Sequence, residues 1–265
     1  MIYKNFKRIC SAIWTWKQPL TKAPTTLNCP ISDLFVWRSN DNWRTYFELI
    51  DIPALFEDNQ LSRYAILVFM NSDGKIFLRH RIALDPLCRQ TLDITSLIGS
   101  QYGELGTFAV FHTSTPKIVG QCGSYLAERG YVSYSYRGAP LRSYVHGNLD
   151  AVTLNKEEGL HFLGGGSFLQ RAYNLQYELD SKVDYEFGLV NPTSRSLTFY
   201  CQLLSLRDGK ITDAEKLEIS SGGVSIGKVR ADKLESKRLV IHSKLVMARP
   251  LVFRFQNFKL DVFHG

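Results

Sequence analysis

The stretch LTFYCQLLSLRDGKI, residues 197–211, is the part of the sequence that decides the expected fold class. Apolar side chains occupy every second position in its first half, namely Leu197, Phe199, Cys201 and Leu203. Successive side chains of a β-strand point to opposite faces, so this alternation indicates a strand with one buried face. The Asp208-Gly209 pair that follows is a common hairpin turn signal. We therefore expect a strand, a tight turn and a returning strand here.

The same alternation recurs along the chain from residue 31 onward, for example at Tyr185, Phe187 and Leu189. Further turn signals stand between the apolar runs: Asp73-Gly74, Asn191-Pro192 and Gly222-Gly223. No long stretch after residue 30 has the three-to-four spacing of a helix. With 265 residues, 45% of them hydrophobic, the chain is long enough for one large or two ordinary globular domains. The sequence therefore predicts an all-β protein.

Short matches between the two halves of the chain indicate an internal duplication. In order, YFELID matches LQYELD, SDGKI matches RDGKI, AVFHT matches LVIHS, and YVHG matches VFHG. The first three matches are separated by about 130 positions, as shown by Glu48 and Glu178, Asp73 and Asp208, and His112 and His242. Self-similarity at so long a period is typical of tandem domains.

We accordingly predict two tandem antiparallel β-sandwich domains, with immunoglobulin-like or jelly-roll-like packing, after a short N-terminal helix. The predicted boundaries are a basic amphipathic segment at 1–30, a first sandwich at 31–150 and a second at 151–265. The junction contains NKEEG and LGGGS, the most linker-like composition in the chain. A single large double sheet is the structural alternative.

The N-terminal segment combines helical apolar spacing with positive charge. Its apolar residues recur at intervals of three and four, namely Ile2, Phe6, Ile9, Ile13 and Trp16. Residues 1–20 could therefore form an interfacial helix that makes peripheral membrane contact, or a helix docked on the first domain. No run of 18 apolar residues occurs, so the sequence predicts no membrane-spanning helix.

Residues 131–148, YVSYSYRGAPLRSYVHGN, contain four tyrosines, two arginines and no carboxylate. They belong to a part of the first half that is about 16 residues longer than its counterpart in the second half. Strand alternation places Val132, Tyr134 and Tyr136, and on the return strand Leu141, Ser143 and Val145, toward the core. The predicted exposed face of this hairpin carries Arg137, Arg142, Tyr144 and His146. Arginine presents a planar fork to carboxylate, sulfate or phosphate, and tyrosine offers a ring for stacking.

A second aromatic stretch, LFVWRSNDNWRTYFEL, places Trp37 and Trp43 on either side of SNDN. These tryptophans could form a stacking edge for a ligand. The alternative is that tryptophan packs the first core.

Charge and cysteine content narrow the class of partner. The formal net charge of +7 and the pI of about 9.1 favour anionic partners. Nucleic acid is not expected, because the charge is modest and the aromatic residues form no known single-strand-binding signature. The five cysteines are odd in number and widely spaced, with no CxxC pair, which favours a reducing, cytoplasmic compartment.

No catalytic fingerprint is present, and we predict no catalytic residue, metal ligand or cofactor. Cys122 in GQCGSY lacks the surrounding pattern of a thiol protease, and LGGGS lacks the lysine of a phosphate-binding loop. The recurrence of His112 with His242, and of His146 with His264, favours a structural role for all four histidines. His146 and Asp150 are the candidates if the protein is instead an enzyme with a site at the inter-domain cleft.

The sequence thus predicts a non-catalytic binding protein that recognises an acidic glycan or another anionic ligand. The predicted ligand-binding residues are Arg137, Arg142, Tyr144 and His146, with Trp37 and Trp43 as stacking partners. The alternatives are a protein–protein scaffold or adaptor, which could act at a membrane surface, and an enzyme with a site at the inter-domain cleft.

Overall fold

The computed structural model describes residues 29–56, 63–86, 88–114, 126–147, 151–154, 159–229, 235–247, 249–257 and 259–265. The predicted N-terminal helix, the proposed membrane contact of residues 1–20, and Cys122 and Asp150 lie outside these residues.

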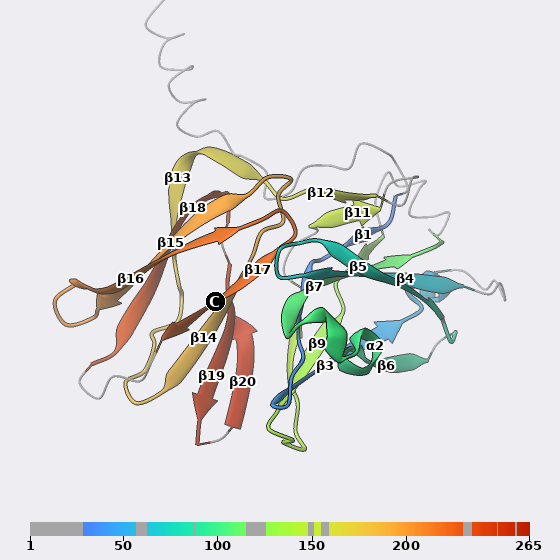
Figure 1. Ribbon diagram of the computed structural model, residues 1–265, viewed down its shortest axis with the longest axis horizontal. Helices are drawn as coiled ribbons and strands as arrows, with labels where there is room; N and C mark the ends of the chain where they lie inside the picture. The colour runs from blue at the N-terminus through green and yellow to red at the C-terminus, as the bar shows by residue number, and fades with distance from the viewer. Residues whose placement is uncertain are drawn as a thin grey trace, which may run out of the picture.

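The second half of the chain builds two four-stranded sheets, drawn on the left of Figure 1. The first has the order β13 (Gly166–Asn174), β18 (Lys237–Leu245), β15 (Leu197–Ser205) and β16 (Ile211–Ile219). The second has the order β17 (Val224–Val229), β14 (Asp184–Val190), β19 (Leu251–Gln256) and β20 (Lys259–His264).

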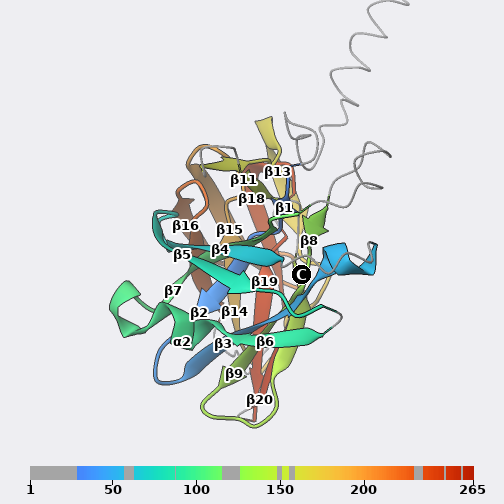
Figure 2. The ribbon, with the colours of Figure 1, turned by 90° about the vertical axis from the view of Figure 1, so that its right-hand side faces the viewer.

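The first half builds two further four-stranded sheets, with β4 and β5 above β3 and β6 in Figures 1 and 2. One has the order β2 (Phe35–Arg38), β7 (Leu105–His112), β4 (Tyr64–Asn71) and β5 (Ile76–Ala83). The other has the order β10 (Ser143–His146), β9 (Tyr131–Tyr136), β3 (Trp43–Ile50) and β6 (Arg89–Asp93). The described helices are short: η1 (Ile52–Leu55), α2 (Ile94–Ile98) and η2 (Ser100–Tyr102).

A fifth sheet consists of very short strands. Its order is β12 (Leu160–Phe162), β11 (Val152–Leu154), β1 (Ile31–Ser32) and β8 (Ala127–Glu128). Strand β1 pairs antiparallel with β11, where Ile31 faces Thr153, and parallel with β8, where Ile31 faces Ala127. This sheet therefore joins segments that are far apart in the sequence.

The expected hairpin of residues 197–211 is confirmed as β15 and β16. Leu197, Phe199, Cys201 and Leu203 are all buried, while most of β16 is exposed. Gly209 adopts a φ of 70°, a left-handed conformation that glycine tolerates without a side-chain clash. The protein is all-β, with 61% of the described residues in strands.

The prediction of two tandem β-sandwich domains is wrong. The described strands form five four-stranded sheets, which is the number and size of the blades in a five-bladed β-propeller. Strand order within a sheet is not sequential, as β13-β18-β15-β16 shows. The sequence did not reveal the fifth sheet, because strands of two or three residues are too short to show alternation.

Strand order explains the short sequence matches. The β2-β7-β4-β5 and β13-β18-β15-β16 sheets have the same relative order. Asp73-Gly74 and Asp208-Gly209 both turn the chain into the outermost strand of such a sheet, and His112 and His242 lie on the corresponding strands β7 and β18. Glu48, however, lies in β3, whereas Glu178 lies outside any strand. The matches thus mark recurring hairpins and do not define two closed domains.

The largest core is shared between the two halves of the chain. It contains Trp37, Phe47 and Phe108 from the first half together with Leu251 and Phe253 from the second. The rings of Trp43 and Phe253 lie 5.3 Å apart. A second core lies wholly within the second half, and a third packs against the small fifth sheet. The two halves are therefore packed on one another through side chains that neither could bury alone.

Candidate functional site

The predicted tyrosine-rich hairpin is present, and it forms the β9–β10 edge of the β10-β9-β3-β6 sheet. Val145 pairs with Val132, and both side chains are buried, as is Tyr134. The Tyr134 hydroxyl donates a hydrogen bond to the carbonyl of Val36 at 2.8 Å. Burial raises the pKa of Tyr134 well above its usual value, so this phenol stays neutral. Its ring packs in the core. Val132, Tyr134 and Val145 thus face inward as predicted, whereas Leu141, predicted on the same face, is 85% exposed.

Two tyrosines remain half-exposed on the outer face of the same sheet edge. Tyr131 is 55% exposed and Tyr144 is 50% exposed. Their strand positions adjoin, because Tyr144 pairs with Ser133 and His146 pairs with Tyr131. The His146 ring meets the Tyr131 ring edge-on at 6.5 Å. This edge therefore offers aromatic surface to an external ligand.

Arg142 lies on the same outer face and is held in place by β3. Its guanidinium carbon lies 3.7 Å from the centroid of the Tyr46 ring, a cation–π contact. Its Nη1 lies 3.9 Å from Oε1 of Glu48, a carboxylate that is almost fully buried. These two contacts therefore hold the Arg142 side chain in one orientation before any ligand binds.

The Glu48 carboxylate is shared between several partners. Its Oε2 accepts a hydrogen bond from the Thr91 hydroxyl at 2.8 Å and lies 3.4 Å from Nε of Arg89 on β6. One carboxylate thus faces two guanidinium groups, Arg89 and Arg142, which leaves a net positive charge on this face. A ligand carboxylate, sulfate or phosphate would complete the charge balance.

Sequence reasoning missed Tyr46, Glu48, Arg89 and Tyr131 as parts of this face. The alternation of Tyr46 and Glu48 along β3 places them on one side of a strand, which the sequence does show. The order β10-β9-β3-β6 brings β3 and β6 to the hairpin, and that order is a property of the tertiary structure.

Arg137 does not join this face. It lies in the turn between β9 and β10 with a φ of 51°, and its backbone N–H donates to the carbonyl of Asn42 at 2.7 Å. Its side chain instead borders a cavity of about 590 Å³ between the two halves. The other charged groups of that cavity are Asp184, Glu186 and Lys228. The cavity is therefore of mixed charge and does not select anions.

His146 faces its counterpart His264 across the junction of the two halves. The ring centroids are 5.0 Å apart, and Nε2 of His264 lies 2.8 Å from the carbonyl oxygen of His146. Burial is the main cause that lowers the pKa of His264 to about 4, so its ring is neutral at pH 7. A neutral ring donates from Nε2 to that carbonyl. Both histidines border a largely apolar crevice that also contacts Tyr134, Leu189 and Leu251.

Trp37 and Trp43 are not on the surface, so the structure contradicts their prediction as stacking partners for a ligand. Both side chains are buried in the shared core. Trp37 donates from Nε1 to the carbonyl of Met70 at 3.0 Å. The Arg38 guanidinium lies 3.6 Å from the centroid of the Trp43 ring and covers it. Burying a large aromatic side chain in the core stabilises the fold more than leaving it at a surface edge.

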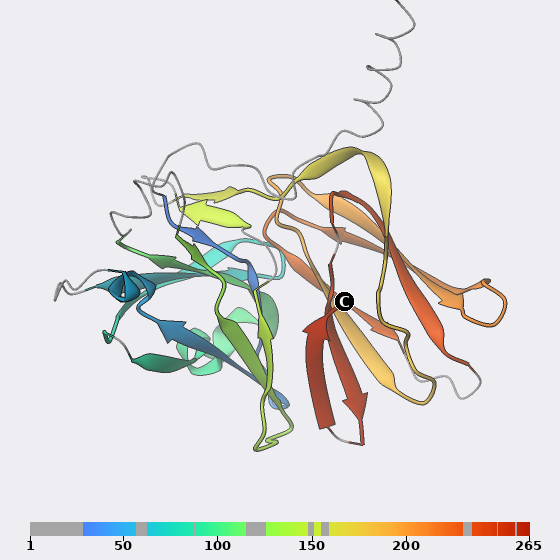
Figure 3. The same cartoon turned by 180° about the vertical axis from the view of Figure 1, so that it is seen from behind.

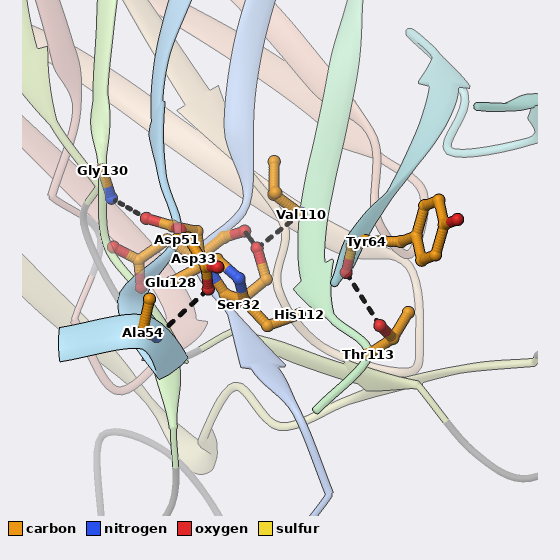
Figure 4. A network of polar contacts seen from close by, with 10 residues as sticks. All are labelled: Ser32, Asp33, Asp51, Ala54, Tyr64, Val110, His112, Thr113, Glu128 and Gly130. Carbon is orange, nitrogen blue, oxygen red and sulfur yellow. Dashed lines mark hydrogen bonds and ion pairs between the residues drawn. The ribbon is translucent and has the colours of Figure 1, made fainter. Parts of the chain in front are cut away.

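A buried polar network lies where β1, β7 and β8 meet (Figure 4). Nε2 of His112 on β7 lies 2.7 Å from Oε2 of Glu128 on β8, and both residues are almost fully buried. The other Glu128 oxygen accepts from the backbone N–H of Gly130 at 2.7 Å. Asp51 forms a buried ion pair with Arg63 at 3.1 Å. These contacts tie the short strand β8 to β7, which suits the structural role predicted for His112.

The described residues contain no group of three or more histidine, cysteine, aspartate or glutamate side chains arranged to hold a metal ion. Among the helices of the described ranges, none has the length and apolar character needed to cross a membrane.

Comparison with known proteins adds no family. No family model matches the chain, and no curated protein matches it. Solved structures that it resembles include a glycosyl hydrolase family 2 member from Bacteroides cellulosilyticus, with 9% identity and a TM-score of 0.15 over 93% of this chain. The chain spans 30% of the length of that protein. A mutant VP2 protein of infectious bursal disease virus gives 13% identity and a TM-score of 0.16, over 91% of this chain and 70% of that one.

Proposed function

We propose that the protein is a non-catalytic binding protein for an anionic ligand. The site is the outer face formed by Tyr46, Arg89, Tyr131, Arg142 and Tyr144, which we call the tyrosine–arginine face. The observation that carries the proposal is the Arg142 guanidinium, stacked on Tyr46 beside a carboxylate that it shares with Arg89.

Preorganisation is the physical reason why this geometry suits recognition. An arginine stacked on an aromatic ring has fewer conformations to lose when it binds, so less of the interaction energy is spent on ordering the side chain. The half-exposed rings of Tyr131 and Tyr144 add apolar contact next to the charge. The ligand class this supports is a carboxylate, sulfate or phosphate carried on a flat or partly apolar body.

Binding of inorganic tripolyphosphate, measured by isothermal titration calorimetry, tests the proposal. We expect saturable binding by the full chain and an affinity about tenfold or more lower for Arg142→Ala, because one charge-assisted hydrogen bond is worth roughly 1.5–3 kcal/mol. Tyr144→Ala should also weaken binding. Tyr200→Ala removes a similarly exposed tyrosine from a different sheet and serves as the matched control.

Equal affinities for the wild type, Arg142→Ala and Tyr144→Ala would contradict the proposal. In that case the two exposed tyrosines would favour the second candidate, a scaffold that meets another protein, because tyrosine and arginine are enriched at protein interfaces. A partner captured by the wild type and lost with Tyr131→Ala and Tyr144→Ala together would support that function. The enzyme alternative stays a prediction, since Asp150 lies outside the described residues.

A cytoplasmic location stays a prediction. Among the described cysteines, Cys88 and Cys201 are free thiols, which accords with a reducing compartment. Mass spectrometry of the alkylated native protein would count the thiols in the whole chain.

A further inference from the structure

Strand β13 contains a wide irregularity that pushes two apolar side chains out of the protein. Gly166 pairs with Leu245 and Arg171 pairs with Ser243, so the segment 167–170 of β13 faces Lys244 alone on β18. Phe168 is 80% exposed and Leu169 is 77% exposed. Two adjacent side chains that are both this exposed contribute nothing to the core. A bulge of this kind re-aims side chains, and bulges often lie beside functional sites.

Cationic groups surround this protruding pair. The Arg171 Nε donates to the Ser167 hydroxyl at 3.3 Å, which folds the arginine back along the bulge. Lys244 is exposed on the neighbouring strand, and the Arg195 side chain lies over Gly166, with Nη2 only 3.0 Å from where a Cβ at that position would be. Arg171, Arg195 and Lys244 form no ion pair with any carboxylate of the described residues.

A cavity of about 280 Å³ adjoins Phe168 and is lined by polar groups. Arg195 and the side chains of Ser167, Thr193 and Ser194 border it, together with Gly164 and Gly166. The Thr193 hydroxyl already donates within the protein, to Asn191 Oδ1 and the Arg195 carbonyl. A guanidinium beside the hydroxyls of Ser167 and Ser194 is suited to a phosphate group, because arginine binds phosphate oxygens in pairs and these hydroxyls add further donors. The cavity lies directly beside apolar side chains that point into solvent.

We propose that this tip docks the protein on a bilayer that contains anionic phospholipid. Phe168 and Leu169 enter the interfacial region of the bilayer, and Arg195 with the neighbouring hydroxyls binds a headgroup phosphate. Arg171 and Lys244 face the negative surface. An aromatic or aliphatic pair framed by arginine and lysine has the chemistry of an interfacial anchor, in which apolar burial and electrostatic attraction act together.

The position of the tip is compatible with this role. Figures 1 and 3 show β13 arching over one end of the molecule, apart from the β10-β9-β3-β6 sheet that carries the tyrosine–arginine face. The bilayer and the ligand of the tyrosine–arginine face would therefore bind at separate places, and the inference does not depend on the proposed function.

Co-sedimentation of the full chain with vesicles tests the docking surface. We expect binding to phosphatidylcholine vesicles that contain phosphatidylserine, and little binding to phosphatidylcholine alone. The double variant Phe168→Ala with Leu169→Ala should lower the partition coefficient at least tenfold, and Arg195→Ala should also lower it. The matched control is Leu55→Ala with Phe56→Ala, which removes another adjacent apolar pair that is 59% and 54% exposed and should bind as the wild type does.

Three further measurements separate the alternatives. Phe168→Trp should show a blue shift of its own tryptophan emission when serine-containing vesicles are added, which reports insertion at this site. Soluble glycerophosphoserine, at a concentration equal to that of the phosphatidylserine headgroups, should not displace the protein from the vesicles, because docking needs the bilayer. Thermal unfolding of each variant should match the wild type, since the altered side chains are exposed.

The proposal is overturned if the wild type does not bind serine-containing vesicles. It is also overturned if the Phe168 and Leu169 double variant binds them equally well, which would place membrane contact elsewhere, for example in residues 1–20. Sedimentation velocity tests a third outcome. If the Phe168 and Leu169 double variant changes only the oligomeric state, the tip is a protein interface and the proposal is overturned.

Discussion

At the scale of single residues, burial decides what each polar or aromatic side chain can do. Trp37 and Arg142 both lie in aromatic and basic stretches of sequence, yet the tryptophan is enclosed and the arginine reaches solvent. The His112–Glu128 pair is the most strongly buried contact between a histidine and a carboxylate in the described ranges. Removing one partner of such a pair leaves the other polar group buried and uncompensated.

We expect His112→Ala to lower the free energy of unfolding by about 3–5 kcal/mol, because Glu128 then loses its partner in a buried site. Urea denaturation of the purified variant measures the loss. His242→Ala is the control, since His242 is only partly buried and contacts Gln202 at 3.2 Å, and it should cost no more than about 1 kcal/mol. Losses of equal size in both variants would count against the structural role of the His112 contact.

At the scale of elements, tight turns set the register of the hairpins. Gly209 between β15 and β16 has a φ of 70°, and Arg137 and Asn257 have a φ of 51° in the turns of β9–β10 and β19–β20. Gly74 in the turn of β4–β5 has a φ of 76°, so the turns of four described hairpins use the left-handed region. That conformation is easy for glycine and tolerable for asparagine, and it costs other residues about 1 kcal/mol or more.

Gly209→Ala isolates this backbone effect, because nothing lies within 4 Å of where the new Cβ would be. The expected loss is about 1 kcal/mol of unfolding free energy from the positive φ alone. Gly209→Asn should cost less, since asparagine enters the left-handed region more readily. Thermal denaturation of the two variants gives the comparison, and an alanine variant as stable as the asparagine variant would show that the turn does not hold this φ in solution.

At the scale of the whole molecule, the two halves are joined by aromatic, ionic and hydrogen-bonding contacts. The rings of Trp43 and Phe253 pack together, Arg38 pairs with Glu186 at 2.6 Å, and His264 bonds to His146. Burial at this junction lowers the pKa of His264 from 6.5 to about 4. The unfolded chain therefore binds a proton on this histidine more tightly than the folded chain does, and that difference makes stability depend on pH.

The sign of this dependence follows from the lowered pKa. The stability associated with neutral His264 is fully present above pH 6.5 and is lost as the pH falls from 6.5 toward 4. His264→Gln cannot titrate, so we expect its urea midpoint to fall less steeply than that of the wild type across this window. Identical slopes in the two proteins would show that His264 is not buried as the structure has it.

Several features follow from the sequence alone because they depend on neighbours in the chain. The alternation at Leu197, Phe199 and Cys201 defines strand β15 and its buried face, and Asp208-Gly209 defines the turn that follows. The same alternation predicted that Val132 and Tyr134 face the core, and both are buried. Period-two patterning is imposed by backbone geometry and needs no knowledge of partners.

Only some residues of the candidate site could be predicted from the sequence. Arg142, Tyr144 and His146 reach the surface of the β9–β10 edge, but Arg137 borders a different cavity. Glu48 and Arg89, which set the charge around Arg142, come from strands whose place beside the hairpin no local pattern reveals. Trp43 was ambiguous because a strong aromatic signal does not distinguish a core side chain from a ligand contact.

By itself, then, the sequence determined the all-β class, the hairpins and the inward and outward faces of their longer strands. Only the tertiary structure decided the five sheets, the core shared through Phe253, the joining of β1 with β8 and β11, and the exposure of Phe168 and Leu169. The physical reason is that strand order and shared burial depend on contacts between distant residues. Such contacts are selected by the packing of the whole chain. Strands of two or three residues have too few side chains to show an alternating pattern in the sequence.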